Sequence, residues 1–333
     1  MTYLFIGGED HDFTKLGGCV VNTATTAARR TAYARCSLEV DSTSATDGWQ
    51  GAFSAPASTF WFTGRVYHNN CGPGTLGDIF SVLDGTTRRL VLKMSASNGK
   101  YQLIKRTAAG TNTTLATAAP NIPPNVLYKL DLFVDYGASG RVQLYADGTL
   151  LIDYSGDVTT DGAATLSGFV LGSVAGSGAT TYASLWSEII AATQDTRALS
   201  LVTLPPSGAG ATWAWTGAYT DLNEVTTSDA TLCTSANPDE TALVAVNTAG
   251  ITGNPAVLAV CVSARAQKGG TGPQNGQLVV RTGGNDYPGG AQPLPAALAR
   301  IANVWESNPA TAGAWATGDL TAAGFNIGIK SLA

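Results

Sequence analysis

Apolar and polar residues alternate along much of the first two hundred residues, and this period of two predicts short β-strands. The segment 60–68 (Phe-Trp-Phe-Thr-Gly-Arg-Val-Tyr-His) is dense in aromatic residues, which strands favour. Many short strands separated by turn residues are typical of a β-sandwich. The strands predicted in this half are 4–6, 33–40, 60–68, 78–83, 88–94, 101–106, 128–134, 141–146, 149–154 and 182–190.

Three dipeptides separate consecutive alternating runs: Asp84-Gly85, Asn98-Gly99 and Asp147-Gly148. Asp-Gly and Asn-Gly favour type I′ turns because both central residues of such a turn take positive φ. Each dipeptide therefore predicts a β-hairpin.

A Pro-Pro-Ser-Gly-Ala-Gly run at 205–210 is typical of a linker or long turn. It places a boundary near residue 200 and predicts two domains, 1–200 and 201–333. In the second domain we expect strands at 240–246, 256–264, 277–281 and 325–329. The second of these is apolar nearly throughout, which predicts a central buried strand.

Trp213 and Trp215 are two positions apart, so on a strand they would share one face, and we expect them to anchor the second domain. One short helix is predicted at 295–306. There Leu298, Ile301 and Trp305 form an apolar face at helical spacing, with Trp305 packed on the β core.

Composition narrows the classes of partner. Charged residues make up 13% of the 333 residues and the net charge is −5, so a nucleic-acid partner is not expected. No apolar run approaches the ~20 residues of a membrane span, and the N-terminus lacks the features of a signal peptide. The five cysteines form no C-x-x-C pair and are widely spaced, so we expect buried free thiols and assembly in a reducing cytoplasm.

Metal and cofactor sites are not predicted. Glu9-Asp10-His11-Asp12 groups metal-ligating residue types, but neighbours on an extended segment alternate faces, and an exposed polar turn is favoured. The acids at 221, 224, 239 and 240 lie loosely together, and loop capping is favoured over a calcium site.

No catalytic residue is predicted, and we expect the protein not to be an enzyme. Its two histidines, His11 and His68, lie far from any nucleophile signature. The acid pair Glu39 and Asp41 lacks the further glutamate of the strand pattern found in jelly-roll glycosidases. A carbohydrate-binding site does not need such a set of catalytic residues. Trp49, Trp61 and Tyr67 are candidates for stacking on sugars, although aromatic residues on strands more often form core.

Two stretches carry a family resemblance. The run Val-Gln-Leu-Tyr-Ala-Asp-Gly-Thr-Leu-Leu-Ile-Asp at 142–153 resembles the strand–turn–strand of laminin-G and concanavalin A-like jelly rolls, over roughly residues 1–195. The whole chain resembles a family of tailed-bacteriophage virion proteins in which such a jelly roll precedes a second small β domain. The residues that carry this likeness are Ser-Glu at 187–188, Asp-Thr-Arg at 195–197, the Pro-Pro segment, 213–224, Trp-Glu-Ser-Asn-Pro at 305–309, Ala-Trp at 314–315 and 325–329.

The resemblance implies an all-β fold of two jelly-roll-like β-sandwich domains in tandem, and a structural component of a phage virion. The expected role is in the tail or baseplate, contributing to host-surface attachment. The alternatives are a head-attached spike or decoration protein, and a virion-associated polysaccharide-binding or depolymerising protein.

The expected partners are further copies of the chain, a trimer by analogy with phage appendages, other virion proteins, and host-surface carbohydrate or pili. The expected location is the virion, assembled in the host bacterial cytoplasm. No sequence pattern specifies the oligomer, the receptor or the position on the particle.

Overall fold

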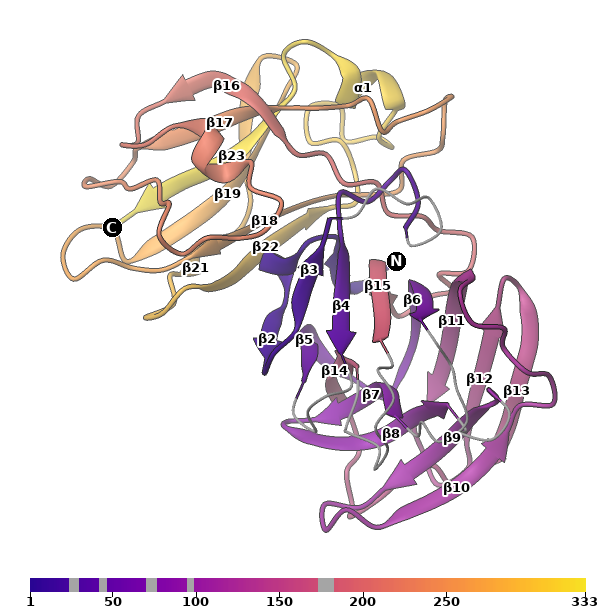
Figure 1. Cartoon of the computed structure of the whole chain (residues 1–333). Helices are drawn as coiled ribbons and strands as arrows, with labels where there is room; N and C mark the ends of the chain where they lie inside the picture. Colours follow the sequence, from indigo (N-terminus) through magenta and orange to yellow (C-terminus); the bar gives the residue numbers. More distant parts are fainter. Residues whose placement is uncertain (24–29, 42–46, 70–76, 95–98, 173–182) are drawn as a thin grey trace. The chain divides into compact units, whose positions relative to one another are not determined.

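The computed structural model describes residues 1–333 except 24–29, 42–46, 70–76, 95–98 and 173–182 (Figure 1). The chain divides into two compact units, Met1–Leu201 and Val202–Ala333. The predicted fold class is confirmed, because strands dominate both units and the described residues contain one short α-helix, α1 (Thr317–Thr321), in the second unit.

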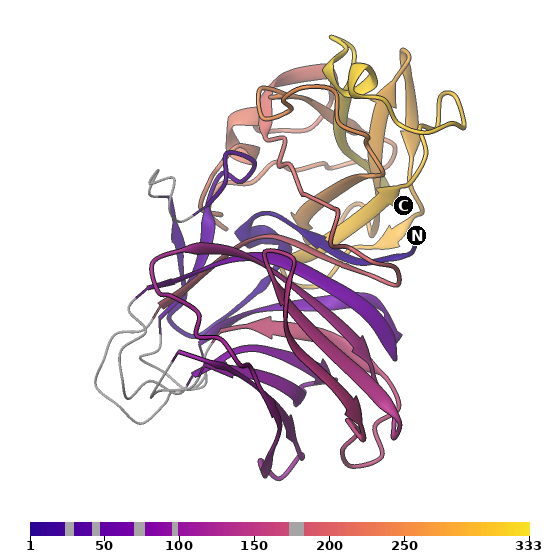
Figure 2. The ribbon, with the colours of Figure 1, turned by 90° about the vertical axis from the view of Figure 1, so that its right-hand side faces the viewer.

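Unit 1 is built from two antiparallel sheets, whose strands run in colour from indigo through magenta to the rose β15 in Figures 1 and 2. The first sheet has eight strands in the order β13-β12-β11-β6-β15-β4-β3, with β1 paired to β15. Its strands are β1 (Tyr3–Gly7), β3 (Val20–Asn22), β4 (Ser37–Asp41), β6 (Thr59–Asn69), β11 (Leu127–Asp135), β12 (Gly140–Ala146), β13 (Thr149–Gly156) and β15 (Ala183–Ala192).

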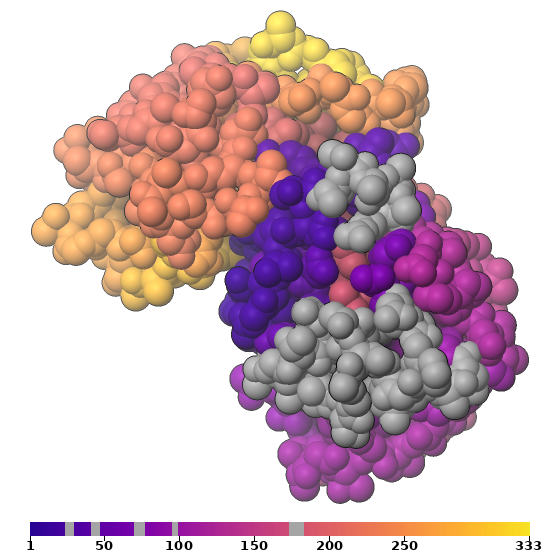
Figure 3. All heavy atoms as spheres, viewed as in Figure 1, coloured from indigo at the N-terminus to yellow at the C-terminus, as the bar shows by residue number. Residues whose placement is uncertain are grey.

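The second sheet of unit 1 has seven strands in the order β10-β9-β8-β7-β14-β5-β2. Residues 101–117, which include β9 and β10, are among the purple-magenta atoms visible on the surface of unit 1 in Figure 3. The strands are β2 (Thr14–Leu16), β5 (Gly48–Ala57), β7 (Gly77–Asp84), β8 (Thr87–Met94), β9 (Tyr101–Arg106), β10 (Asn112–Thr117) and β14 (Leu166–Leu171). The 3₁₀ turn η1 (Asp10–Asp12) precedes β2.

Aromatic rings fill much of the space between the two sheets. Phe169 on β14 is fully buried, and its ring centroid lies within 6.3 Å of the rings of five other phenylalanines. Edge-to-face and offset contacts of this kind add stability beyond the burial of apolar area. The five are Phe5, Phe13, Phe53, Phe62 and Phe80.

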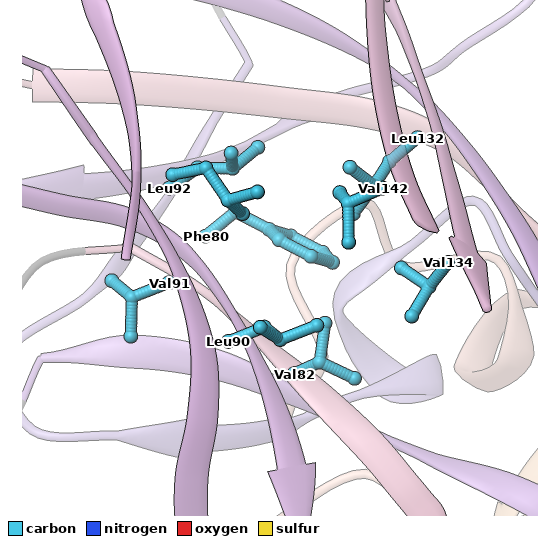
Figure 4. A pocket seen from close by; sticks show the side chains of 9 residues that line it. Phe80, Val82, Leu90, Val91, Leu92, Leu132, Val134 and Val142 are labelled. Carbon is cyan, nitrogen blue, oxygen red and sulfur yellow. The ribbon is translucent and has the colours of Figure 1, made fainter. Parts of the chain in front are cut away.

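Aliphatic side chains line the rest of this core. In Figure 4, Leu132, Val134 and Val142 from β11 and β12 lie opposite Phe80 and other side chains of the seven-stranded sheet. The space between them is too narrow to admit a water molecule. The interior of unit 1 therefore offers packing here and no ligand pocket.

Two of the predicted hairpins are formed, and one of them has the predicted type I′ turn. Asp147 (φ 46°) and Gly148 (φ 77°) both take positive φ between β12 and β13, as a type I′ turn needs. Between β7 and β8, Gly85 (φ 59°) makes the turn after Asp84. The third predicted turn includes Asn98, which lies outside the described residues.

Unit 2 holds a six-stranded sheet and a two-stranded sheet. The larger sheet has the order β16-β17-β23-β19-β20, with β21 paired to β19. Its strands are β16 (Pro206–Trp213), β17 (Thr241–Val246), β19 (Asn275–Thr282), β20 (Asn285–Pro288), β21 (Gln292–Pro293) and β23 (Asn326–Leu332). The smaller sheet pairs β18 (Val260–Ala266) with β22 (Ala299–Trp305), and the 3₁₀ turn η2 is Tyr219–Leu222.

The helix predicted at 295–306 is wrong, because most of that segment is strand β22. It pairs with β18 residue for residue, from Val260 opposite Trp305 to Ala266 opposite Ala299. Ile301 and Trp305 are four residues apart, an interval that keeps two side chains on one face of a strand as well as of a helix. The partner strand, which is distant in sequence, decides between the two.

The expectation of a central buried strand at 256–264 is also wrong. The strand there is β18, which begins at Val260 and has β22 as its single partner. Of its seven residues, only Val262 is fully buried. Part of the apolar run therefore packs against the core of unit 2, but the strand does not join the six-stranded sheet.

Trp213 and Trp215 do not anchor unit 2, because both are half-buried and lie outside its core. Their indole N–H groups donate to the backbone oxygens of Gly217 and Glu240. The core is instead built around the buried rings of Trp315 and Phe325, which meet edge to face, with Leu278, Val280 and Ile301 among the aliphatic side chains.

The cysteine prediction is confirmed for Cys19 and Cys36, which are free and fully buried. Burial raises the pKa of these thiols to about 11 and about 12. Cys233 and Cys261 are half-buried, and Cys71 lies outside the described residues.

A polar contact joins the two sheets of unit 1 within the core. His68 on β6 and Tyr101 on β9 are both fully buried, and His68 Nε2 lies 2.6 Å from Tyr101 Oη. Burial lowers the pKa of His68 to about 3. The imidazole is therefore neutral in the folded protein at ordinary pH.

We expect this histidine to make folding sensitive to acid. In the unfolded chain its pKa is about 6.5, so between about pH 6.5 and pH 3 the unfolded state binds more protons and stability falls as pH falls. The expected loss from His68 is roughly 3 kcal/mol between pH 7 and pH 4. Urea unfolding across this range, for the wild type and His68→Leu, measures it. Parallel stability curves for the two proteins would contradict the assignment.

Candidate functional site

The outer face of the eight-stranded sheet is set by the alternation of β6. Phe60, Phe62 and Val66 point into the core, which leaves Trp61 and Thr63 on the opposite face. Strand β6 lies between β11 and β15, so the side chains of three neighbouring strands meet on this face.

Three half-exposed rings on this face form what we call the aromatic patch: Trp61, Phe133 and Tyr145, from β6, β11 and β12. The ring centroids of Trp61 and Phe133 are 5.1 Å apart. Those of Trp61 and Tyr145 are 6.2 Å apart, with an angle of 29° between the ring planes. Phe133 is the register partner of Trp61 across the strand pair. Cross-strand aromatic pairs stabilise a sheet, and these three rings remain half-exposed.

A cation from a distant part of the sequence lies over the patch. The Arg197 guanidinium carbon is 4.8 Å from the ring centroids of both Trp61 and Tyr145, a cation–π arrangement. Arg197 Nε and Nη2 donate to the Asp195 carboxylate at 3.0 and 2.7 Å. These hydrogen bonds raise the pKa of Arg197 and lower that of Asp195. The Arg197 side chain remains 42% exposed.

Beside the patch, a buried polar cluster fixes the segment that carries Arg197. The Thr63 hydroxyl donates to Asp131 Oδ1 at 2.6 Å and lies 2.5 Å from the Thr196 hydroxyl. Lys129 Nζ donates to the backbone oxygens of Arg197 and Leu199 at 2.5 and 2.7 Å. Burial raises the pKa of Asp131 and lowers that of Lys129.

Glu188 adds a second buried carboxylate. It lies where the pairing of β15 with β6 shifts register, and its φ of 56° is unusual for a residue other than glycine. The Thr31 hydroxyl donates to Glu188 Oε1, and Arg65 Nε lies 3.8 Å from Glu188 Oε2. Burial raises the pKa of this glutamate.

Of the three predicted binding residues, only Trp61 is placed where a ligand could reach it. Trp49 is 2% exposed in the core, and its indole N–H donates to the Glu39 backbone oxygen. Tyr67 is 7% exposed, and its hydroxyl donates to Asn125 Oδ1. The predictions for Trp49 and Tyr67 are corrected accordingly, because a ring enclosed by protein has no face left for a sugar.

The other members of the site were not predicted. Phe133 and Tyr145 alternate with core residues on their strands, so the period-two pattern contains a signal for their outward positions. It does not say that two strands place them beside Trp61. Arg197 lies more than a hundred residues from Trp61 in sequence, and no local pattern connects them.

The candidate metal ligands are committed to other contacts. Asp12 Oδ2 accepts hydrogen bonds from the backbone N–H groups of Gly8 and Glu9, and Arg35 Nη2 donates to Glu9 at 2.6 Å. Glu9 and Asp12 are buried, which corrects the expectation of an exposed turn. No group of three or more His, Cys, Asp or Glu residues within the described part of the chain is arranged to hold a metal ion.

The four acids considered for a calcium site, at 221, 224, 239 and 240, do not converge on one point. Asp221 accepts the Ala218 backbone N–H, and Glu224 accepts the Ser228 backbone N–H. Glu240 accepts from Ser235 and Asn237, while Asp239 pairs with Lys330 at 2.8 Å. These contacts are those of acids that cap loops.

No protein-family model and no curated protein matches the sequence. Among solved structures, the chain is similar to an endo-β-1,4-glucuronan lyase from Trichoderma reesei, with 10% identity and a TM-score of 0.42 over 58% of this chain and 94% of that one. It is also similar to the carbohydrate-binding module CBM66 from Bacillus subtilis, with 14% identity and a TM-score of 0.34 over 53% and 96%. Likenesses at this level carry no argument about ligand or reaction.

Within the described ranges, no helix has the length and apolar character that spanning a bilayer would require.

Two matched threonines test how much the polar cluster contributes. Thr63 donates to buried Asp131, whereas Thr59 donates to Asp135 at 3.0 Å in an exposed pair on the same two strands. We expect Thr63→Val to lower the free energy of unfolding by about 2 kcal/mol, because it removes a donor from a buried carboxylate. Thr59→Val should change it by less than about 0.5 kcal/mol. Equal effects in urea unfolding would contradict a special role for the buried pair.

Proposed function

We propose that the protein is a non-enzymatic, polysaccharide-binding structural protein, and that the aromatic patch is its binding surface. The observation that carries the proposal is the arrangement of Trp61, Tyr145 and Arg197. Two half-exposed rings, inclined at 29° to each other, lie under one guanidinium group that is itself exposed.

This arrangement matches the chemistry of a sugar. A pyranose ring presents apolar C–H faces that pack on aromatic rings, and hydroxyl groups around its edge that accept hydrogen bonds. Arg197 uses Nε and Nη2 on Asp195, so the donors of Nη1 remain for such hydroxyls. The neighbouring Arg141 and Asp153, both substantially exposed, supply further polar groups on β12 and β13.

The buried carboxylates favour binding over catalysis. Asp131 and Glu188 have raised pKa values, as general acids often do, and both lie on the outer face of the sheet. Yet each is at most 3% exposed and hydrogen-bonded to a threonine within the fold. A carboxylate without access to a glycosidic bond has no catalytic role, so both are assigned to holding the outer face together.

We further propose that this binding serves host-surface attachment on a tailed-phage particle, in the tail or baseplate. Support comes from the sequence resemblance that spans both units, including 213–224 and 305–309. A protein displayed in many copies needs only weak individual sites, because multivalency multiplies their effect. A shallow aromatic patch fits that requirement.

Replacement of the central ring tests the binding surface. We expect Trp61→Ala to weaken binding to host-surface polysaccharide by about tenfold or more, since truncating a central aromatic anchor commonly costs over 1.4 kcal/mol. Affinity electrophoresis or calorimetry with polysaccharide from the host measures this change.

Trp213→Ala is the matched control, because Trp213 is also half-buried but lies in unit 2. Equal losses in the two variants would exclude the aromatic patch as the surface. A fall in polymer viscosity on incubation with the wild type would contradict the non-enzymatic part of the proposal.

Labelling of intact phage particles tests the location. Antibody against the purified chain, viewed by negative-stain microscopy, is expected to mark the tail tip or baseplate. Label over the capsid would replace the tail assignment with a head spike or decoration protein. Particles without label would remove the virion assignment.

A further inference from the structure

A second surface of unit 1 carries an unbalanced charge. On the outer face of the seven-stranded sheet, the register places Lys93 of β8 opposite Asp78 of β7. The side chains of Arg88 on β8 and Arg106 on β9 reach the same carboxylate. The alternate residues of these strands, among them Phe80, Leu90 and Leu92, point into the core. We call Asp78, Arg88, Lys93 and Arg106 the cationic cluster.

The three cations converge on one carboxylate. Arg106 holds Asp78 with two hydrogen bonds, Nη1 to Oδ2 at 2.5 Å and Nη2 to Oδ1 at 3.1 Å. Arg88 Nη1 and Lys93 Nζ each lie 3.6 Å from the same carboxylate, which is too far for a hydrogen bond. Asp78 is 1% exposed and fully engaged by Arg106.

The cluster therefore has positive charge and donors in excess. Within these four residues, three cations face one carboxylate. The adjacent Arg89 is held separately by Asp84 and Asp161. Arg88 Nη1 is buried without a hydrogen-bond partner. The Ser81 hydroxyl, on the same face, is also buried without one. Burial lowers the pKa of Arg88 and repulsion from Arg106 adds to this, while the charge of Asp78 and its direct contact with the guanidinium oppose it.

Such a cluster lacks an anion. Buried donors without partners cost free energy, and like charges held together cost more. An oxyanion shared by Arg88 and Lys93 would satisfy both, since guanidinium and ammonium groups bind carboxylate and phosphate oxygens through short, charge-assisted hydrogen bonds. The side chains of Arg88, Lys93 and Arg106 keep 13–19% exposure, so the cluster is open to solvent at its rim.

We propose that the cationic cluster is a second binding site, specific for the oxyanion groups of an acidic polysaccharide. This inference rests on the proposed polysaccharide-binding function and narrows its ligand class. The aromatic patch would hold sugar rings in general, and the cationic cluster would select polymers that carry uronate carboxylates or phosphates. Because the whole chain has a net charge of −5, its overall charge does not attract anions. The selection for acidic polymers would come from the cationic cluster itself.

Calorimetry with three polymers tests the proposal: hexagalacturonate for carboxylate, inorganic polyphosphate for phosphate, and cellohexaose as the neutral polymer. Lys93→Gln removes one cation and leaves Arg106 on Asp78. We expect it to weaken binding of at least one acidic polymer about tenfold at low salt, and to reduce the dependence of that affinity on ionic strength. Binding of the neutral polymer should not change.

Lys105→Gln is the matched control. It makes the same change of charge on the same sheet, but Lys105 pairs with Asp157 and lies outside the cluster. Arg88→Gln serves as a second variant and should lower the same affinity with an unchanged circular dichroism spectrum. The polymer whose affinity depends on Lys93 identifies the anion as carboxylate or phosphate.

Two results would overturn the inference while the proposed function stands: preference of the wild type for the neutral polymer, or equal affinities for Lys93→Gln and Lys105→Gln. If the acidic polymers bind with the expected Lys93 dependence but Trp61→Ala binds them normally, the cationic cluster stands and the aromatic patch fails. Absence of binding to all three polymers and to host polysaccharide would remove both proposals.

Discussion

The structure of unit 1 depends on the alternation of β6 between two environments. This strand lies in the middle of the eight-stranded sheet, paired to β11 on one side and β15 on the other. Its inward residues include Phe62, which joins the ring cluster around Phe169. Because side chains on a strand point alternately to opposite faces, burying these rings forces Trp61 and Thr63 outward. The core thus determines which residues can meet a ligand, and a shift of one residue in register would exchange the two sets.

The outward residues divide between holding the fold and meeting solvent. The segment 193–199 is held by Thr63 and Lys129, and Thr63 also donates to Asp131. The buried charges of Asp131 and Lys129 are tolerated because each has hydrogen-bond partners. That segment in turn places Arg197 over Trp61 and Tyr145. The aromatic patch is therefore pre-organised by the polar cluster beside it, and its rings and guanidinium need little reordering to accept a ligand.

The two sheets of unit 1 differ in how their buried charged side chains are paired. On the eight-stranded sheet, Glu188 and Asp131 are buried with hydroxyl donors, and cations lie near both. On the seven-stranded sheet, three cations surround Asp78 alone, and the guanidinium of Arg88 has a buried nitrogen with no acceptor. An excess of this kind is costly within a fold. A ligand that supplies the missing acceptor is the simplest physical reason for its presence.

By itself, the sequence determined the local elements of this protein. The period of two located β6, β7, β8, β11 and β12, and Asp147-Gly148 located a hairpin, because strand alternation and positive φ are properties of neighbouring residues. It also implied the all-β class. Only the tertiary structure decided the rest. Pairing with β18 made 299–305 a strand, and burial removed Trp49 and Tyr67 from the candidate site. Strand register placed Trp61 near Tyr145 and Lys93 opposite Asp78, and long-range side-chain contacts brought Arg197 to the first pair and Arg88 to the second. These contacts join residues far apart in the chain, and local periodicity contains no information about them.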